Sequence, residues 1–496
     1  MTDAAAPAPT GRQTVLVALG QGSVMATGGI LAILIAQLFG KNTDTDAFFA
    51  AYGFYTVGIT LGGTFRFTAI PRLVADTDGR TSTRMLGAVA LMAAALLVPM
   101  VLLASPLGTV LIAQDPGAVA PATLRILWFA LAAQILAALL AALLSVRGRF
   151  TALGLAMLFA GFVSLPLFVA LEGSVGVKAA AIAVTGGGLW QVAVSLTALR
   201  RDGWRPHALL GGTTQALGQV ARQAGYLIGA SGPFLGTAVA YVICVAIVSR
   251  QGAGEATLFA YAFVVASVLL GMTAYVSAQV HSPSVMASTD RRGEAIEASG
   301  WTLRFSLLLC GPVLTLVCLV GAPVLGFVLG GDFSDRDVTT VLTGGACMAG
   351  WLFASAASVF AVIELLAQER LRALGVIAVV QVLVSAALAL VAAPVAGVPG
   401  VALALSLTQI GVAAAQMHLA FGPALPALGR DVLDALGREL VVVVAMAVPA
   451  LVLLLAVGGV GGTVAAGVVA AVAAIVATLR MWPQESRSLL GLLRRA

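Results

Sequence analysis

The chain has 496 residues, of which 60% are hydrophobic and only 10% are charged, and its formal net charge is +6. A soluble protein of this length cannot bury that much apolar surface, so lipid must surround most of the chain. Membrane topology accounts for the excess of positive charge, and we predict no nucleic-acid partner.

About 14 segments are long and apolar enough to cross a bilayer, since one span needs roughly 20 residues. The apolar run that follows the first 13 residues lacks an obvious cleavage site, and we interpret it as a retained first span. These patterns predict an all-α integral membrane protein. The segments are 14–39, 47–69, 84–104, 122–144, 151–171, 178–199, 226–249, 257–280, 301–323, 339–365, 371–393, 398–421, 438–457 and 461–480.

Arginine and lysine residues follow the predicted loops in a regular alternation. If the N-terminus is cytoplasmic, 20 of the 27 basic residues fall on the inner side, 4 on the outer side and 3 just inside spans. Basic residues concentrate in the cytoplasmic loops of membrane proteins. The bias therefore predicts that both termini are cytoplasmic.

The sequence also contains a weak internal repeat. Gly40 and Gly252 are 212 positions apart, as are Pro71 and Pro283, and Gly176-Val177 recurs 221 positions later at 397–398. Spans one to six would thus match spans seven to twelve. Because six is an even number, the two six-helix lobes would share one orientation and be related by a parallel pseudo-two-fold axis along the membrane normal.

The repeat predicts four parts of the chain, listed here in order. They are an N-lobe at 1–199, a cytoplasmic interfacial linker at 200–225, a C-lobe at 226–421, and two extra C-terminal spans with a cytoplasmic tail at 422–496.

The first outer hairpin carries the most informative polar residue, Asp46, which lies at the start of the second span. A carboxylate at this place is either a gate or proton-coupling group, or simply a cap on the helix N-terminus. Both interpretations remain open from the sequence.

Five further residues are candidates for substrate binding or gating, each with a structural alternative. Arg66 would meet a substrate phosphate or extend to lipid headgroups. The amides of Gln134 and Gln381 would line a cavity or hydrogen-bond neighbouring helices. Tyr52 and Tyr261 would stack on a sugar or prenyl chain, or pack in the core.

Cofactor and metal chemistry has no support in the sequence. The three histidines are scattered, and the cysteines lie in apolar runs without metal-ligand spacing. We predict no metal, no cofactor and no catalytic residue, and we expect all four cysteines to be small core residues.

Three segments resemble one family of membrane transporters. "IAQLFGKNTDTDAFFAAYGF" at 35–54, "RILWFALAAQILAALLAALLSVRGRFTALG" at 125–154 and "GAPVLGFVLGGDFSDRDV" at 321–338 are similar to the MurJ/MviN lipid II flippases of the multidrug/oligosaccharidyl-lipid/polysaccharide exporter superfamily. The resemblance implies alternating-access export of a polyprenyl-linked sugar intermediate across the bacterial cytoplasmic membrane. It places Asp46 on the family's Asp-Ala-Phe aspartate.

The resemblance also reveals departures from the family pattern. The family's cavity arginines fall on Leu31 and near Ile59 and Thr60, and its Tyr-Ala-Asp-Arg sequence reads Tyr-Ala-Phe-Val at 261–264. Arginine suits a pyrophosphate because its guanidinium offers paired donors. An asparagine of the sodium site found in some members reads Gln381. The missing arginines favour an alternative substrate, and the replacement at Gln381 leaves the sodium site without support.

Three functions therefore compete. The first is a flippase for a lipid II-like precursor, and the second is a small-molecule, drug or secondary-metabolite exporter of the same superfamily that uses ion antiport. The third, a polytopic glycosyltransferase, lacks the expected outer domain, so we predict that the protein is not an enzyme. We expect a monomer that contacts the bilayer and its lipid-linked saccharide, with coupling to membrane potential, protons or sodium.

Overall fold

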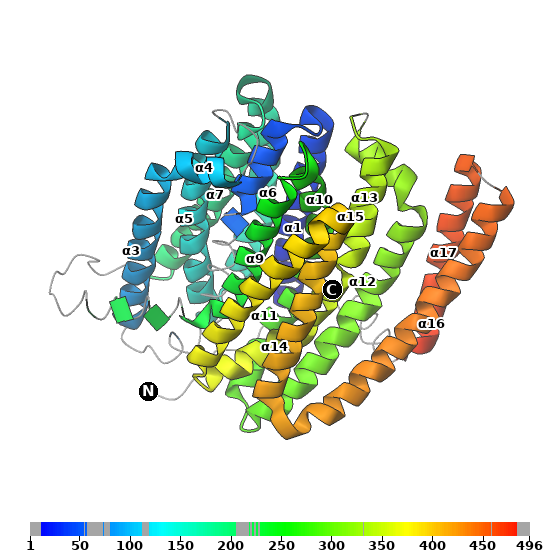
Figure 1. Ribbon diagram of the computed structural model, residues 1–496. Helices are drawn as coiled ribbons and strands as arrows, with labels where there is room; N and C mark the ends of the chain where they lie inside the picture. Colours follow the sequence, from blue (N-terminus) through cyan, green and yellow to red (C-terminus); the bar gives the residue numbers. More distant parts are fainter. Residues whose placement is uncertain are drawn as a thin grey trace. The chain divides into compact units, whose positions relative to one another are not determined.

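The computed structural model shows a protein built of helices, and no strand occurs in the part of the chain that it describes (Figure 1). The described residues are 11–53, 55–56, 73, 80–111, 119–204, 218, 221–222, 225–226, 229–330, 332–457 and 459–483. The helices group into two compact units.

The first unit comprises Met1–Ile35, Lys41–Thr257 and Leu366–Leu390. Its labelled helices are α1 (Gly11–Phe39), α3 (Arg80–Leu102), α4 (Ala104–Leu111), α5 (Val119–Val146), α6 (Phe150–Val175), α7 (Lys178–Arg201) and α9 (Gly232–Val248). Helix α5 packs against α3, α4 and α7, and α6 packs against α7. A helix that is apolar on all sides, as α5 is, belongs in the interior of such a bundle.

Small residues bring helices of the first unit close together. A Cβ atom added to Gly20 of α1 would lie 2.7 Å from the carbonyl oxygen of Gly154 on α6. Because lipid gives helices little hydrophobic reason to associate, such close backbone contacts provide much of the packing energy. Both glycines are therefore explained by packing.

The second unit comprises Ala36–Gly40, Leu258–Leu365 and Val391–Ala496. It contains most of α10 (Glu255–Leu270), followed by the π-helix η1 (Gly271–Tyr275), α11 (Val276–Ala287), α12 (Arg291–Leu329), α13 (Asp335–Cys347) and α14 (Ala349–Ala367). The end of α15 (Leu371–Phe421), the short η2 (Gly422–Ala424), α16 (Leu425–Val457) and α17 (Gly459–Met481) complete it. Helices α16 and α17 form a hairpin that packs on α12 (Figure 1).

The described helices agree with the prediction of many apolar spans, while the predicted number of about 14 stays a prediction. Within the described residues, ten helices are long and apolar enough to cross a membrane, and α9 is a shorter apolar helix. The chain is a multi-pass membrane protein with the predicted all-α fold. Most of predicted span 47–69, and residues 205–217 of predicted linker 200–225, lie outside the described residues.

Two predicted spans have unexpected breaks. The predicted span 339–365 is two helices that meet at Met348, where the Ser406 hydroxyl donates to the Cys347 carbonyl and accepts from the Trp351 backbone N–H at 3.0 Å. The break therefore keeps its backbone groups paired. Predicted span 257–280 contains the π-helix η1.

The core assignment of the cysteines was wrong at one position. Cys318 on α12 is exposed, whereas Cys244 and Cys310 are buried as expected. A solvent- or lipid-facing thiol on an apolar helix gives no sequence signal that distinguishes it from a core residue.

Backbone conformation supports the register of the repeat. Gly176 (φ 63°, ψ −145°) and Gly397 (φ 57°, ψ −141°), which are 221 positions apart, share a conformation that favours glycine. Gly148 (φ 69°) and Glu369 (φ 55°) are also 221 positions apart, and Glu369 is the one non-glycine with positive φ in the described chain. The two compact units are defined by which helices pack together, whereas the predicted lobes are defined by the sequence repeat. The units therefore do not test the lobe boundaries, which remain a prediction.

The strained position of Glu369 gives a stability prediction. A left-handed conformation costs a residue with a Cβ about 1–2 kcal/mol, so Glu369→Gly should raise the thermal unfolding midpoint of the purified protein. Gly148→Ala should lower the midpoint, because it introduces the same strain at the equivalent turn. Glu369→Ala is the control, since it removes the carboxylate and keeps the strain. Equal midpoints for wild type and Glu369→Gly would refute this explanation.

Candidate functional site

The hairpin that follows α1 is shaped by its own polar residues. Gly40 has a positive φ of 63°, which ends α1. The Asn42 side-chain oxygen then accepts from the backbone N–H groups of Asp44 at 2.9 Å and Thr45 at 3.0 Å, and so caps the helix that begins at Thr43. Asn42, rather than Asp46, is therefore the N-cap of this helix.

The Asp46 carboxylate instead binds the beginning of α10, about 210 residues further along the chain. One oxygen accepts from the Gly254 N–H at 2.6 Å, and the other accepts from the Thr257 N–H at 2.9 Å and the Thr257 hydroxyl at 2.6 Å. These amides lie at a helix N-terminus, where N–H groups lack intrahelical partners and favour a negative charge. We call this contact the Asp46 latch.

The latch is buried, and one of its positions is occupied by a glycine with positive φ. Asp46 is only 3% exposed. Gly254 has φ 86°, and a Cβ there would overlap the Lys41 side chain, so this position favours glycine. The latch is thus a built contact between the first hairpin and the first turn of α10.

Burial is the main influence on the charge of Asp46. Burial raises the pKa of Asp46 above its ordinary value, while the hydrogen bonds from Thr257 and Gly254 and the nearby Lys41 act in the opposite direction. A raised pKa means that the latched carboxyl binds a proton more tightly than an exposed one.

The latch contains a contact between equivalent residues of the repeat. The hydroxyl groups of Thr45 and Thr257 lie 3.3 Å apart and are separated by 212 positions, the spacing found in the sequence. Equivalent residues of two-fold-related repeats contact each other only near the axis. The pair is therefore the place where a pseudo-two-fold axis would pass.

Two of the predicted site residues are joined through a third. Tyr52 stacks on Phe48, with ring centroids 5.7 Å apart, and lies 5.4 Å from the Tyr55 ring. The Tyr55 side chain is in turn hydrogen-bonded to Gln134 of α5. Sequence reasoning named Tyr52 and Gln134 separately, and the aromatic spacing alone could not show that Tyr55 connects them.

The other predicted residues have structural partners or lie elsewhere. Gln381 is fully buried and donates to the Thr237 hydroxyl at 2.8 Å, which ties α15 to α9 within the first unit. Tyr261 is buried against Phe333 in the second unit, with centroids 5.9 Å apart. Arg66 lies outside the described residues.

No metal centre appears in the described residues, which contain no group of three or more His, Cys, Asp or Glu side chains placed to hold an ion. The absence of any cofactor remains a prediction.

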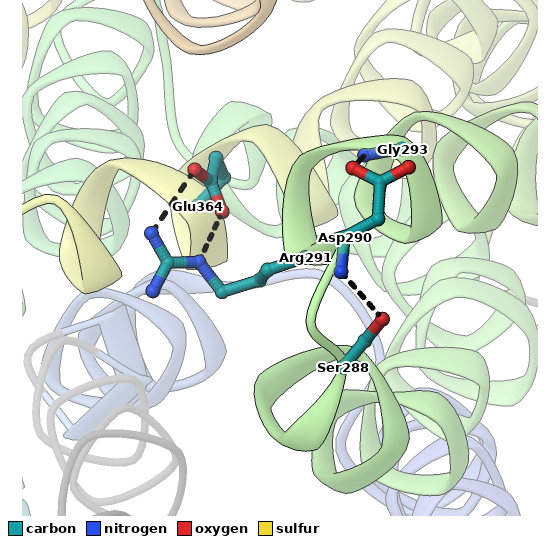
Figure 2. A network of polar contacts seen from close by, with 5 residues as sticks. All are labelled: Ser288, Asp290, Arg291, Gly293 and Glu364. Atoms are coloured by element: carbon teal, nitrogen blue, oxygen red, sulfur yellow. Dashed lines mark hydrogen bonds and ion pairs between the residues drawn. The ribbon is translucent and has the colours of Figure 1, made fainter.

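Sequence reasoning missed a buried ion pair in the second unit (Figure 2). The Arg291 Nε donates to one oxygen of Glu364 at 2.9 Å, and Nη2 donates to the other at 3.4 Å. Asp290 caps α12 by accepting from the Gly293 N–H at 3.1 Å, and its own N–H donates to Ser288 at 3.2 Å. The signal was present in the sequence, because Glu364 is a lone acid within an apolar run.

The ion pair should contribute to stability. Glu364 is 2% exposed and Arg291 36% exposed. Removing the arginine takes the guanidinium away from a buried carboxylate, which is strongly destabilising in a dry site and less so here because solvent reaches the guanidinium. We expect Arg291→Met to destabilise the protein by roughly 1–3 kcal/mol.

The matched control is the double variant Arg291→Met/Glu364→Met, which removes both charges and should recover much of the lost stability. Thermal unfolding in detergent measures all three proteins. An Arg291→Met protein as stable as wild type would show that the pair contributes nothing.

Comparison with solved structures shows which fold this protein has. A MOP-superfamily transporter from Pyrococcus furiosus aligns with a TM-score of 0.60 and 14% identity, covering 85% of this chain and 96% of that one. An outward-facing MATE multidrug-resistance transporter aligns with a TM-score of 0.58 and 12% identity, covering 87% and 99%. The chain thus has the fold of the MOP transporters.

The family follows from two further matches. The structure of a lipid II flippase MurJ in an inward closed conformation aligns with a TM-score of 0.71 and 15% identity, covering 96% of this chain and all of that one. The model of the family described as "Lipid II flippase MurJ" matches residues 35–481, and the chain belongs to this family. The resemblance found in the sequence is confirmed. No curated protein sequence matches significantly.

Proposed function

We propose that this protein moves a lipid-linked cell-wall precursor of the lipid II type from the inner to the outer leaflet of the bacterial cytoplasmic membrane. The match of the lipid II flippase family over residues 35–481 carries this conclusion. Transport proceeds by alternating access, without covalent chemistry by the protein. The protein acts as a monomer with both termini in the cytoplasm, and protons, sodium or the membrane potential drive it.

The Asp46 latch supplies a gate for this cycle. The predicted orientation puts both the 40–46 hairpin and the turn before α10 on the outer side of the membrane. Three donors converge there on one carboxylate. Such a contact is strong when made and is broken as a unit when the hairpin and α10 separate, as an outer gate requires.

Phosphate recognition differs from the family pattern. Leu31, which takes the place of a cavity arginine, is 5% exposed and packs in the interior. We assign the pyrophosphate contact to Arg66, which the predicted topology puts near the inner end of span two, where substrate enters. A guanidinium at that place offers paired donors to phosphate oxygens.

The same observation at Leu31 supports a second candidate function. A cavity with fewer arginines suits an uncharged or cationic small molecule better than a pyrophosphate. The alternative is therefore export of a drug or secondary metabolite by ion antiport, as in other MOP transporters.

Complementation separates the two candidates. We expect expression of this chain to restore growth when the lipid II flippase is depleted from a bacterium that depends on it, and labelled lipid II to reach the outer leaflet. Arg66→Ala should reduce rescue more than Arg66→Lys. Absence of rescue despite verified membrane expression would reject lipid II as substrate and favour the small-molecule exporter.

The latch gives a sharper prediction within the same assay. Asp46→Ala leaves three buried donors without an acceptor, which costs the latched state at least about 2 kcal/mol, or roughly thirty-fold in its population. We expect rescue to be lost or greatly reduced.

Asp44→Ala is the matched control for this variant. Asp44 is exposed two positions earlier, and only its backbone N–H takes part in the Asn42 cap. It should therefore behave as wild type. Full rescue by Asp46→Ala at equal expression would remove the latch from the mechanism.

A further inference from the structure

One buried carboxyl group in the second unit differs from its neighbours. Glu439 on α16 is 6% exposed, and neither of its carboxyl oxygens has a hydrogen-bond partner among the described residues. The other buried acids of this unit are satisfied, Asp337 by the Ser334 capping box and Glu364 by Arg291 (Figure 2). The burial of Glu439 without a hydrogen-bond partner therefore needs an explanation.

The carboxyl group lies against Gly311 of α12, next to a residue that interrupts the backbone bonding of this helix. A Cβ at Gly311 would overlap the carboxyl oxygen of Glu439, so glycine makes room for this side chain. The next residue is Pro312, inside the same helix. Proline has no N–H, so it cannot donate to the carbonyl of Leu308 four residues earlier. Leu308 itself belongs to the apolar cluster shared by α12, α16 and α17.

These contacts favour a protonated acid. A protonated carboxyl is both a donor and an acceptor, and a carbonyl deprived of its helical partner is the acceptor that the O–H needs. An ionised carboxylate would instead be buried without a hydrogen-bond donor among the described residues. That arrangement costs several kcal/mol unless a cation pairs with it.

No cation among the described residues pairs with Glu439. From α12, the Cys310 thiol faces it, and Arg304 lies two turns earlier without an ion pair to it. The adjacent Arg438 bonds Asp434 at 2.7 Å and the Met481 carbonyl at 3.2 Å.

Helix α17, which also packs on α16, carries one charged residue, Arg480, and this residue is exposed near the helix end. In the described part of the chain, Glu439 thus forms no ion pair that would stabilise its ionised form.

We propose that Glu439 is a proton-binding site that holds the α16–α17 hairpin against α12 when protonated and loosens it when the proton leaves. Resting on the function proposed above, this site couples movement of the lipid-linked substrate to pH. The ligand is the proton itself, and the carboxyl oxygen of Glu439 carries it.

Chemical labelling tests the site without any transport assay. Dicyclohexylcarbodiimide, an apolar reagent, adds to protonated carboxyl groups within membranes and leaves a stable N-acylurea that peptide mass spectrometry locates. With the full-length protein in lipid nanodiscs, we expect labelling at Glu439 that falls as the pH is raised. Glu364, equally buried but paired with Arg291, is the internal control and should stay unlabelled.

Infrared spectroscopy covers the case in which the reagent cannot reach the residue. The carbonyl band of a protonated carboxylic acid should be present in the wild-type protein at neutral pH and lost in Glu439→Gln, but kept in Asp44→Asn. A spectrum unchanged by Glu439→Gln would overturn the proposal. Protection from labelling by sodium chloride would also overturn it, because the ligand would then be a metal cation.

The coupling is tested with the same conservative variant. Glu439→Gln imitates the protonated acid and should keep the wild-type unfolding midpoint, while the pH dependence of lipid export disappears. Unchanged pH dependence in an active Glu439→Gln protein would refute the coupling. If the chain does not export lipid II at all, the labelling and infrared results still decide the proton site.

Discussion

The structure depends on one constraint, the lack of water inside a bilayer, which forces polar groups to find partners within the protein. The described helices meet it in specific ways. Ser406 joins the two backbone ends at the break between α13 and α14. Arg291 neutralises Glu364, and Asp46 accepts the free amides at the start of α10. Each of these contacts fixes the position of one helix against another, so the polar residues that the membrane makes costly also determine the geometry.

The same constraint explains which features could be predicted from the sequence. Apolar length defines spans, and so α5, α6 and α7 lie within a few residues of their predicted ends. Asp46 was recognised as a candidate, but its partners were not, since Thr257 is 211 positions away and a hydroxyl in an apolar run carries no marker. Sequence periodicity likewise did not reveal the helix break at Met348, although Gly344, Gly345 and Gly350 beside it are poor helix formers.

Two of the buried acids of the second unit, Glu364 and Glu439, show how one residue type takes different roles. Glu364 has a guanidinium within 2.9 Å and serves as a fixed anchor for α12. Glu439 instead lies against a glycine of a helix that a proline interrupts, so in our proposal it gains and loses a proton. A rigid anchor and a chargeable contact on the same helix would allow α12 to stay in place while the α16–α17 hairpin responds.

The Thr45–Thr257 contact has a consequence for how a duplicated chain becomes asymmetric. A residue near a two-fold axis contacts the equivalent residue of the other repeat, so the two identical groups must be able to bind each other. A hydroxyl does so because it donates and accepts at once. Two carboxylates at equivalent positions near the axis would repel each other. Only one of the two positions carries a carboxylate, because the position equivalent to Asp46 is Leu258. The contact would thus join an acceptor in one predicted lobe to donors in the other, which makes it directional although the Thr45–Thr257 pair beside it is self-complementary.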